Sequence, residues 1–176
     1  MEEESSTRHE YLHGEIYGMA GGSPDHAALA AAVIGLLRNQ LPPTCRVFTS
    51  DLRIRIAKTG LSTYADATVV CGRTERAAED RLAVVNPVLL VEVTSPSTED
   101  YDLGDKLNHY KQLASVREIL LVSHREPQLS LHRREEDASP GWAVLQGRRG
   151  ETLALQSIAA RLSVDDVYRD GLEDVG

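Results

Sequence analysis

The residue that most constrains how this chain can fold is Glu92, an acid inside an otherwise apolar run. Residues 88–91 are all valine or leucine, and Val93 follows the acid. A run this short, ending before Ser95-Pro96, predicts a strand buried on both faces. A carboxylate inside such a strand is costly unless a cation or hydrogen bonds compensate it. The sequence therefore predicts a functional site around Glu92.

A second acid, Asp66, stands at the head of another apolar run, Ala67 to Val70. Neighbouring strands lie about 4.8 Å apart, so carboxylates at matching heights could share one divalent ion. Mg²⁺ prefers hard oxygen ligands and keeps several waters, which makes one or two carboxylates sufficient. We therefore expect Asp66 and Glu92 to bind Mg²⁺ or Mn²⁺. Taken alone, Asp66 could equally be a strand-end cap.

Lys106 is the third candidate for the site. Residues 97–100 predict the start of a helix that runs to about Ala114, and on it Lys106 and Tyr110 lie one turn apart on one face. That face can look back at the strand ends. A lysine beside a metal-bound water can orient the water or assist its deprotonation. The alternative is a solvated helix lysine. Asp51, Glu99, Asp100 and Asp102 are interpreted as turn or capping residues.

The remaining pattern predicts one domain over residues 1–176 with a mixed α/β or α+β fold. Ser23-Pro24-Asp25 begins a helix that Pro42-Pro43 stops. Residues 73–86 are expected to form a polar, partly helical connection. Residues 9–19 predict a hairpin, residues 163–166 begin a short final helix, and strands are expected at 46–49, 52–57, 64–71, 87–94, 117–123, 128–133, 142–146 and 152–156.

The composition limits the partners. A net charge of -8 argues against a dedicated nucleic-acid binder, but a nuclease can combine acidic catalytic residues with a local basic rim. Candidates for that rim, or for ordinary solvated faces, are Arg53, Arg55, Lys58, Arg125, Arg133, Arg134, Arg148 and Arg149.

Other features of the sequence indicate the cellular compartment of the protein. No apolar stretch approaches the roughly 18 residues of a membrane helix, and the acidic start does not indicate a signal peptide. We therefore expect a cytoplasmic protein without a membrane partner. Cys45 and Cys71, the only cysteines, are expected to be buried reduced thiols.

One motif suggests a different enzyme. His9-Glu10-Tyr11-Leu12-His13 matches the HExxH pattern of zinc proteases, which requires both histidines on one helical face. Gly14 follows at once, and Ile16-Tyr17 favours a strand. We therefore expect no zinc site there.

Three stretches together resemble the Uma2 family of the PD-(D/E)XK nuclease superfamily, which is grouped with restriction endonucleases. They are residues 14–26, residues 64–71, and residues 91–100 with Asp102, Lys106 and Tyr110. The likeness covers about residues 10–168. It implies a restriction-endonuclease-like core, a central mixed sheet flanked by helices, with Asp66 and Glu92 as metal ligands.

The resemblance also assigns roles to other residues. The superfamily lysine usually lies two residues after the glutamate, where this chain has Thr94, so the family pattern points to Lys106. Glu15 matches an early family glutamate and would join the site, and His26 matches a further family position. Ala65 replaces the proline expected before Asp66, which removes no ligand.

The resulting hypothesis is a Mg²⁺-dependent endonuclease that hydrolyses DNA phosphodiester bonds, with catalytic residues Asp66, Glu92, Lys106 and Glu15. The family and the need to cut two strands favour a homodimer. The alternative is a catalytically silent nuclease fold that acts as a binding or dimerisation module.

Overall fold

The fold is built around a six-stranded mixed sheet with strand order β11-β10-β9-β8-β6-β3. It is described from a computed structural model that defines residues 9–12, 15–18, 22–135 and 141–172. β8 and β9 run parallel, whereas the other neighbours are antiparallel. The mixed α+β class is therefore confirmed. The strands are β3 (Cys45–Thr49), β6 (Ala67–Cys71), β8 (Leu89–Val93), β9 (Glu118–Val122), β10 (Gln128–Arg134) and β11 (Trp142–Arg148).

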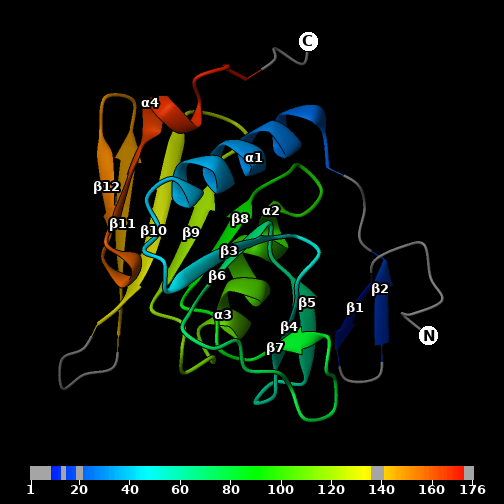
Figure 1. Cartoon of the computed structure of the whole chain (residues 1–176). Coiled ribbons are helices and arrows are strands. Elements are labelled where there is room, and N and C mark those ends of the chain that lie inside the picture. Colours follow the sequence, from blue (N-terminus) through cyan, green and yellow to red (C-terminus); the bar gives the residue numbers. More distant parts are fainter. Residues whose placement is uncertain (1–8, 13–14, 19–21, 136–140, 173–176) are drawn as a thin grey trace.

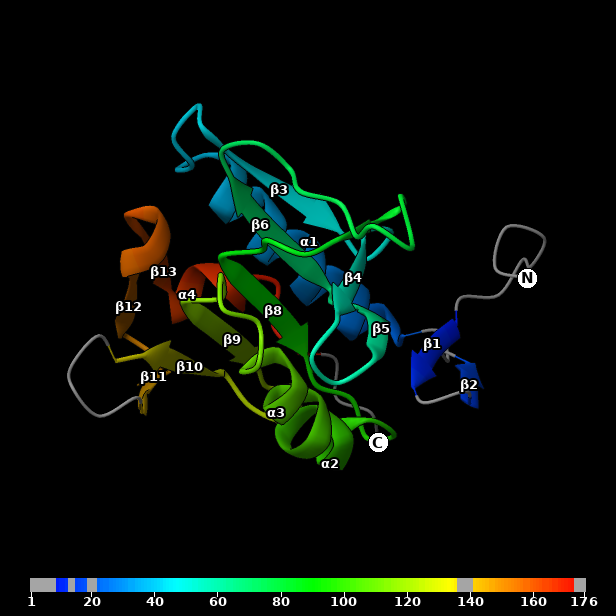
Figure 2. The same ribbon diagram turned by 90° about the horizontal axis from the view of Figure 1, so that it is seen from below.

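Helices cover both faces of this sheet (Figures 1 and 2). Helix α1 (Pro24–Arg38) lies across one face and packs Leu29, Val33 and Leu37 against it. The other face carries the crossover that the parallel neighbours β8 and β9 require. This crossover is a helical segment made of α2 (Glu99–Tyr101), the π-helical turn η2 (Asp102–Lys106) and α3 (Leu107–Tyr110).

The two longer predicted helices both exist, with one difference in length. Ser23 caps α1 by accepting a hydrogen bond from the His26 backbone N–H at 3.2 Å, and Pro24 opens the helix, as the sequence indicated. The crossover helix was expected to reach about Ala114 but ends at Tyr110. It also contains the π-helical turn, which the 3.6-residue pattern gave no reason to expect. Among the described residues, no helix is long and apolar enough to cross a membrane.

Alternation along β8 decides where Glu92 points. Leu89, Val91 and Val93 join the core under α1, whereas Leu90 belongs to the second core with Tyr110. Successive side chains of a strand point to opposite faces, so Glu92 shares the face of Leu90. The buried acid therefore faces the crossover helices.

A second, five-stranded sheet has the order β2-β1-β5-β4-β7 and lies beside the first (Figure 1). The expected hairpin is confirmed as an antiparallel pair. The run at 64–71, expected to be one strand, divides between the two sheets at Ala65-Asp66, because β5 ends at Tyr64 and β6 begins at Ala67. The strands of the five-stranded sheet are β1 (His9–Leu12), β2 (Glu15–Gly18), β4 (Arg53–Ile56), β5 (Leu61–Tyr64) and β7 (Ala83–Val84).

The connection at 73–86 was wrongly expected to be partly helical. Instead it forms turns, the short strand β7 and a bridge between Arg76 and Val84. Its polar side chains bind backbone groups that a helix would use. The Asn86 amide oxygen accepts from the Glu75 N–H at 2.9 Å, and Asp80 accepts from the Leu82 N–H at 3.0 Å. Such local bonds compete with helix formation.

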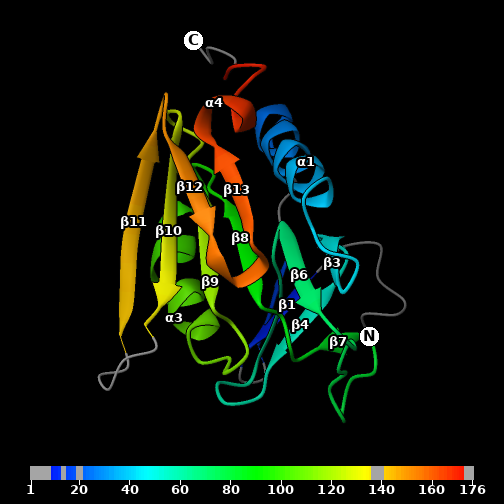
Figure 3. The ribbon, with the colours of Figure 1, turned by 60° about the vertical axis from the view of Figure 1, so that its left-hand side comes forward.

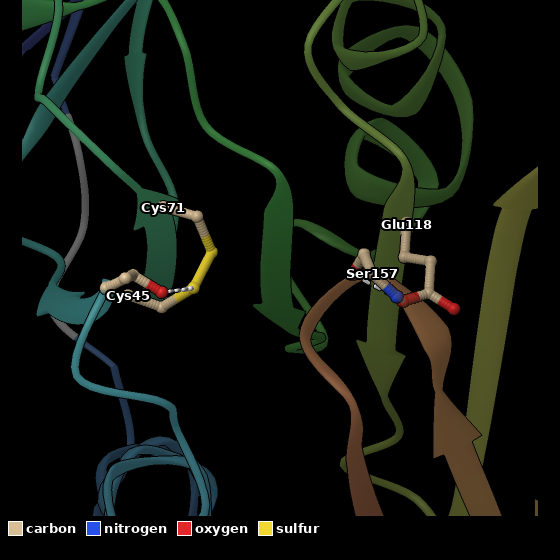
Figure 4. Close-up of a disulfide and its surroundings, with 5 residues drawn as sticks. Cys45, Cys71, Glu118 and Ser157 are labelled. Carbon is tan, nitrogen blue, oxygen red and sulfur yellow. Dashed lines mark hydrogen bonds between the residues drawn. A yellow bond between two sulfur atoms is a disulfide. The ribbon is translucent and has the colours of Figure 1, made fainter.

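The expectation of reduced thiols is also wrong, because Cys45 and Cys71 form a disulfide between β3 and β6 (Figure 4). The two residues are partners in the strand ladder, and their Cα atoms lie 4.0 Å apart. The 26-residue separation fits neither a CxxC motif nor a zinc pattern. Only the pairing register of the two strands brings the cysteines together.

The chain ends in β12 (Thr152–Leu155), a 3₁₀ turn (Gln156–Ile158), β13 (Ala160–Ser163) and α4 (Val164–Val167), which lie on the α1 side of the sheet (Figure 3). The buried carboxylate of Glu118 fastens this unit to β9. It accepts hydrogen bonds from the Gln156 and Ser157 N–H groups at 3.1 and 2.9 Å and from the Ser157 hydroxyl at 2.5 Å. Arg133 Nε donates to the same carboxylate at 2.8 Å.

Glu118→Gln tests this attachment. The amide would present an N–H₂ group to donors that need an acceptor and would leave Arg133 without its charge partner. We expect the free energy of unfolding in urea to fall by about 3 kcal/mol. Glu126→Gln, an exposed change in the next loop, is the control and should change it by less than about 0.5 kcal/mol. Equal stability of the two variants would contradict the anchoring role.

Candidate active site

Glu92 makes two polar contacts on the face of β8 that carries the crossover. The residue is 4% exposed, and its carboxylate accepts a hydrogen bond from the Tyr110 hydroxyl at 2.5 Å. Lys106 Nζ lies 3.1 Å from the same oxygen, Oε1. The predicted meeting of Glu92 and Lys106 is therefore present in the structure.

The π-helical turn supplies the lysine. Asp102 and Lys106, its first and last residues, are both buried, whereas Leu103 and Asp105 between them are exposed. Asp102 Oδ1 lies 3.7 Å from Lys106 Nζ. Single π-helical turns occur often at functional sites, since the wider turn changes which side chains share a face. Here the turn directs an acid and a base together toward the sheet.

Asp66 occupies the short link between β5 and β6 and approaches β8 from its side. Its Oδ2 accepts a hydrogen bond from the Val93 backbone N–H at 2.7 Å. The same oxygen lies 3.3 Å from His26 Nε2. Asp66 is therefore attached to the residue that follows Glu92 in the strand.

His26 enters the site from the first turn of α1. Gly22 lies against its ring, since a Cβ at that glycine would stand 2.5 Å from His26 Nδ1. The hydrogen bond to Asp66 raises the pKa of His26 above its usual value, although burial opposes the shift. The glycine and the acid thus fix the ring from two sides.

The pKa of Glu92 is strongly shifted from its ordinary value. Burial raises its pKa to about 8, while the Lys106 charge opposes the shift and the charges of Asp66 and Asp102 add to it. The three carboxylates and the lysine therefore act as one electrostatic group. With all four ionised, the carboxylates exceed the lysine by two negative charges, and a protonated His26 would offset one of them.

Oxygen donors suited to a divalent ion are present, but they form only a partial ligand set. Across residues 9–12, 15–18, 22–135 and 141–172, no three histidine, cysteine or acidic side chains are arranged to hold a metal. The contacts of Asp66 described above use Oδ2, and those of Glu92 use Oε1. Each carboxylate therefore has a second oxygen that these contacts do not use. Two carboxylates with water and substrate oxygens suffice for Mg²⁺.

Thr94 occupies the place where the wider superfamily usually has its lysine, and it has a structural role here. Its hydroxyl contacts His124 Nδ1 at 2.8 Å and accepts a hydrogen bond from the His124 N–H at 3.1 Å. Thr94 therefore joins the carboxyl ends of β8 and β9.

Two other predictions concern the N-terminal residues. The Glu15 side chain lies outside the described part of the structure, so its role in the site remains a prediction. Its backbone begins β2, the outer strand of the smaller sheet. The HExxH stretch lies largely on strand β1, which ends at Leu12. A strand does not place the residues of this motif on one helical face, as the zinc-protease mechanism requires.

Most arginines of the expected basic rim bind acceptors of the chain itself. Ion pairs join Arg53 to Asp80, Arg55 to Glu79, Arg125 to Glu99 and Arg133 to Glu118. Arg134 donates to the backbone carbonyls of Val116, Lys111 and Leu113. These guanidinium groups would have to exchange partners before they could bind a phosphate.

Asp102 is the site residue that the sequence interpretation missed, since it was interpreted as a turn or capping residue. A usable signal existed, because an acid four residues before a lysine on a helix is a favourable pair. Four acids lie between residues 99 and 105, however, and only the fold shows which one is buried.

Comparisons with known proteins place this geometry in context. The family described as "Uma2: Putative restriction endonuclease" matches residues 1–165. Two uncharacterised proteins of Synechocystis sp. (strain ATCC 27184 / PCC 6803 / Kazusa) are similar. One is 35% identical over 96% of this chain and 87% of its own length, the other 30% identical over 69% of each.

A solved structure has the same fold. It is described as a putative nuclease belonging to DUF820 from Anabaena variabilis ATCC 29413. The two structures match with a TM-score of 0.73 over 94% of this chain and 92% of that one, at 19% identity. This similarity confirms the nuclease-like fold.

The raised pKa of Glu92 predicts how stability depends on pH without metal. The unfolded chain ionises this acid near the ordinary glutamate pKa of 4.5, whereas the folded protein keeps it protonated up to about pH 8. The unfolded state therefore binds fewer protons in this window, so Glu92 lowers the free energy of unfolding as pH rises from about 5 to 8. The expected loss is on the order of 4 kcal/mol.

Urea unfolding in EDTA at pH 5 and pH 8 measures this effect. Glu92→Gln should remove most of the Glu92 contribution to the decline, while the exposed change Glu126→Gln should keep the wild-type pH dependence. If Glu92→Gln and wild type lose the same stability between the two pH values, Glu92 does not titrate in this window.

Proposed function

The chain belongs to the Uma2 family, and from this premise we propose that it is a metal-dependent endonuclease that hydrolyses DNA phosphodiester bonds. Asp66 and Glu92 hold a divalent ion, Mg²⁺ or Mn²⁺, Lys106 orients the attacking water, and Glu15 assists by ligation or positioning. The observation that carries the proposal is the excess of carboxyl groups over basic side chains in the site.

A purely structural role does not explain why the fold buries this excess of carboxyl groups. Glu92, Asp102 and Lys106 are each no more than 4% exposed, and Asp66 adds a third carboxylate to the electrostatic group. Burying a charge is costly unless it is paired. Lys106 balances one carboxylate and a protonated His26 can balance a second, while burial keeps Glu92 protonated up to about pH 8 because its pKa is raised. A divalent cation would supply the charge that allows Glu92 to ionise beside the other two acids. Carboxylate oxygens are the donors that such hard cations prefer.

The side chains around the two acids are suited to fixed roles. The Val93 N–H and His26 hold Asp66, and Tyr110 holds Glu92, so neither acid has to reorganise greatly to bind. Lys106 presents its ammonium beside Glu92, where it can orient a water toward the phosphorus. The water oxygen forms the new P–O bond, the bond to the leaving oxygen breaks, and the water proton passes to solvent or to a nearby base.

A bound divalent ion supplies Lewis-acid stabilisation of the phosphate charge and lowers the pKa of the attacking water. This contribution explains why the protein needs few cationic side chains at the reacting phosphate. It also fits an acidic chain in which most rim arginines already bind acceptors of the protein.

A nicking assay with supercoiled DNA tests this function. Wild type with Mg²⁺ or Mn²⁺ should convert supercoiled plasmid to the nicked or linear form, and EDTA should stop the reaction. Asp66→Asn, Glu92→Gln and Lys106→Gln should each lower the rate by at least about 100-fold. The exposed change Asp105→Asn, one residue before Lys106, should retain the wild-type rate.

The same assay separates the endonuclease from the alternative of a catalytically silent binding module. A silent module would leave the plasmid intact with every metal, although the protein is folded by circular dichroism. Equal cleavage by wild type and the site variants would show that a contaminating nuclease is responsible and would reject the site.

We further propose a homodimer located in the cytoplasm, where two active sites could cut both strands of one duplex. Light scattering should give a mass of about twice the 19.3 kDa of the chain. A mass of 19.3 kDa at micromolar concentration would contradict the dimer.

A further inference from the structure

Asp102 is buried to the same degree as the groups assigned to catalysis, although neither the family resemblance nor the proposed function gives it a role. It is 3% exposed, compared with 4% each for Glu92 and Lys106. A buried carboxylate requires compensating contacts, and those of Asp102 include Thr98 and Lys106.

The position of Asp102 is fixed from the loop that follows β8. The Thr98 hydroxyl donates a hydrogen bond to Asp102 Oδ2 at 2.6 Å. Thr98 Oγ1 in turn lies 2.8 Å from the Ser95 hydroxyl oxygen. This chain of hydroxyl contacts orients the carboxylate so that its other oxygen, Oδ1, faces Lys106 Nζ at 3.7 Å.

Lys106 contacts the two acids in different ways. Lys106 Nζ lies 3.1 Å from Glu92, within hydrogen-bond distance, and 3.7 Å from Asp102, which is too long for a direct hydrogen bond. Asp102 thus attracts the ammonium electrostatically without replacing its contact with Glu92. The charged end of this long, flexible side chain therefore lies between Glu92 on the strand and Asp102 on the π-helical turn.

The wide turn makes this arrangement specific. Asp102 and Lys106 are the first and last residues of the π-helical turn, so one backbone unit carries both groups. Asp105, in the same turn, is exposed to solvent. The turn therefore selects one of its two acids for the site and directs the other outward.

From these contacts we propose that Asp102 is a positioning residue that, held by Thr98, fixes the Lys106 ammonium beside Glu92. The catalytic part of this proposal rests on the proposed endonuclease function, in which Lys106 orients the attacking water. The structural part, that Asp102 fixes the lysine, does not require catalysis. A merely structural acid would stabilise the turn without changing how Lys106 is held.

The direct readout is the NMR signal of the Lys106 ammonium in metal-free protein. The chain has only three lysines, Lys58, Lys106 and Lys111, so selective ¹⁵N-lysine labelling gives a spectrum that is simple to assign. Lys106→Gln identifies its signal. Asp102→Asn should shift that signal or broaden it beyond detection, whereas Asp105→Asn, which removes the same charge from the exposed side of the turn, should leave it unchanged.

The kinetic readout separates positioning from substrate binding. Under saturating DNA, Asp102→Asn should lower kcat on the order of 100-fold, because misplacing a catalytic group costs about this much. KM for DNA should not rise, because Asp102 has no proposed contact with substrate. Asp102→Glu, which restores a carboxylate, should recover part of kcat, and Asp105→Asn should match wild type.

Thr98→Val keeps the proposal testable if Asp102→Asn fails to fold. This nearly isosteric change keeps the Asp102 charge but removes the hydroxyl that orients it, so it should move the Lys106 signal and lower kcat to a smaller extent. An unchanged Lys106 signal in both variants would overturn the positioning role. If wild type cleaves no DNA while Asp102→Asn still moves the signal, the proposed function fails and the anchoring of Lys106 stands.

Discussion

The burial of Glu92 is the constraint on which the rest of the site depends. β8 lies in the middle of the sheet with helices on both faces, so an acid in its interior is largely removed from solvent, and Glu92 is 4% exposed. The ammonium of Lys106 and the hydroxyl of Tyr110 compensate it, at 3.1 and 2.5 Å. Both groups belong to the crossover that a parallel β8–β9 pair requires. The crossover that connects the parallel strands β8 and β9 therefore also supplies the positive charge that compensates Glu92.

The other half of the site depends on a break between two sheets. Because β5 and β6 belong to different sheets, the two residues between them lie at the edge of β8, and Asp66 binds the Val93 N–H there. The first turn of α1 brings His26 to the same carboxylate. Parts of the chain far apart in sequence thus meet at the carboxyl end of one strand, which is where open α/β sheets commonly hold ligands.

The charge distribution is consistent with a site that depends on a cation more than on a basic surface. Carboxylates exceed lysine inside the site, and outside it several arginines bind acids or carbonyls of the chain. A phosphate approaching such a protein meets little unpaired positive charge from these side chains. Under the proposed function, the metal and Lys106 together provide the attraction at the reacting phosphate.

The sequence by itself determined the α+β class, the main strands, the cap of α1, and the candidates Asp66, Glu92 and Lys106. These follow from local rules, since apolar runs, capping residues and an acid within a buried strand can be read without knowing which segments are neighbours. Only the tertiary structure decided the Cys45–Cys71 pairing, the contact of His26 with Asp66, and the burial of Asp102 instead of Asp105. Each depends on strand register, on the meeting of distant segments or on a π-helical turn, and none of these leaves a periodic signal in the sequence.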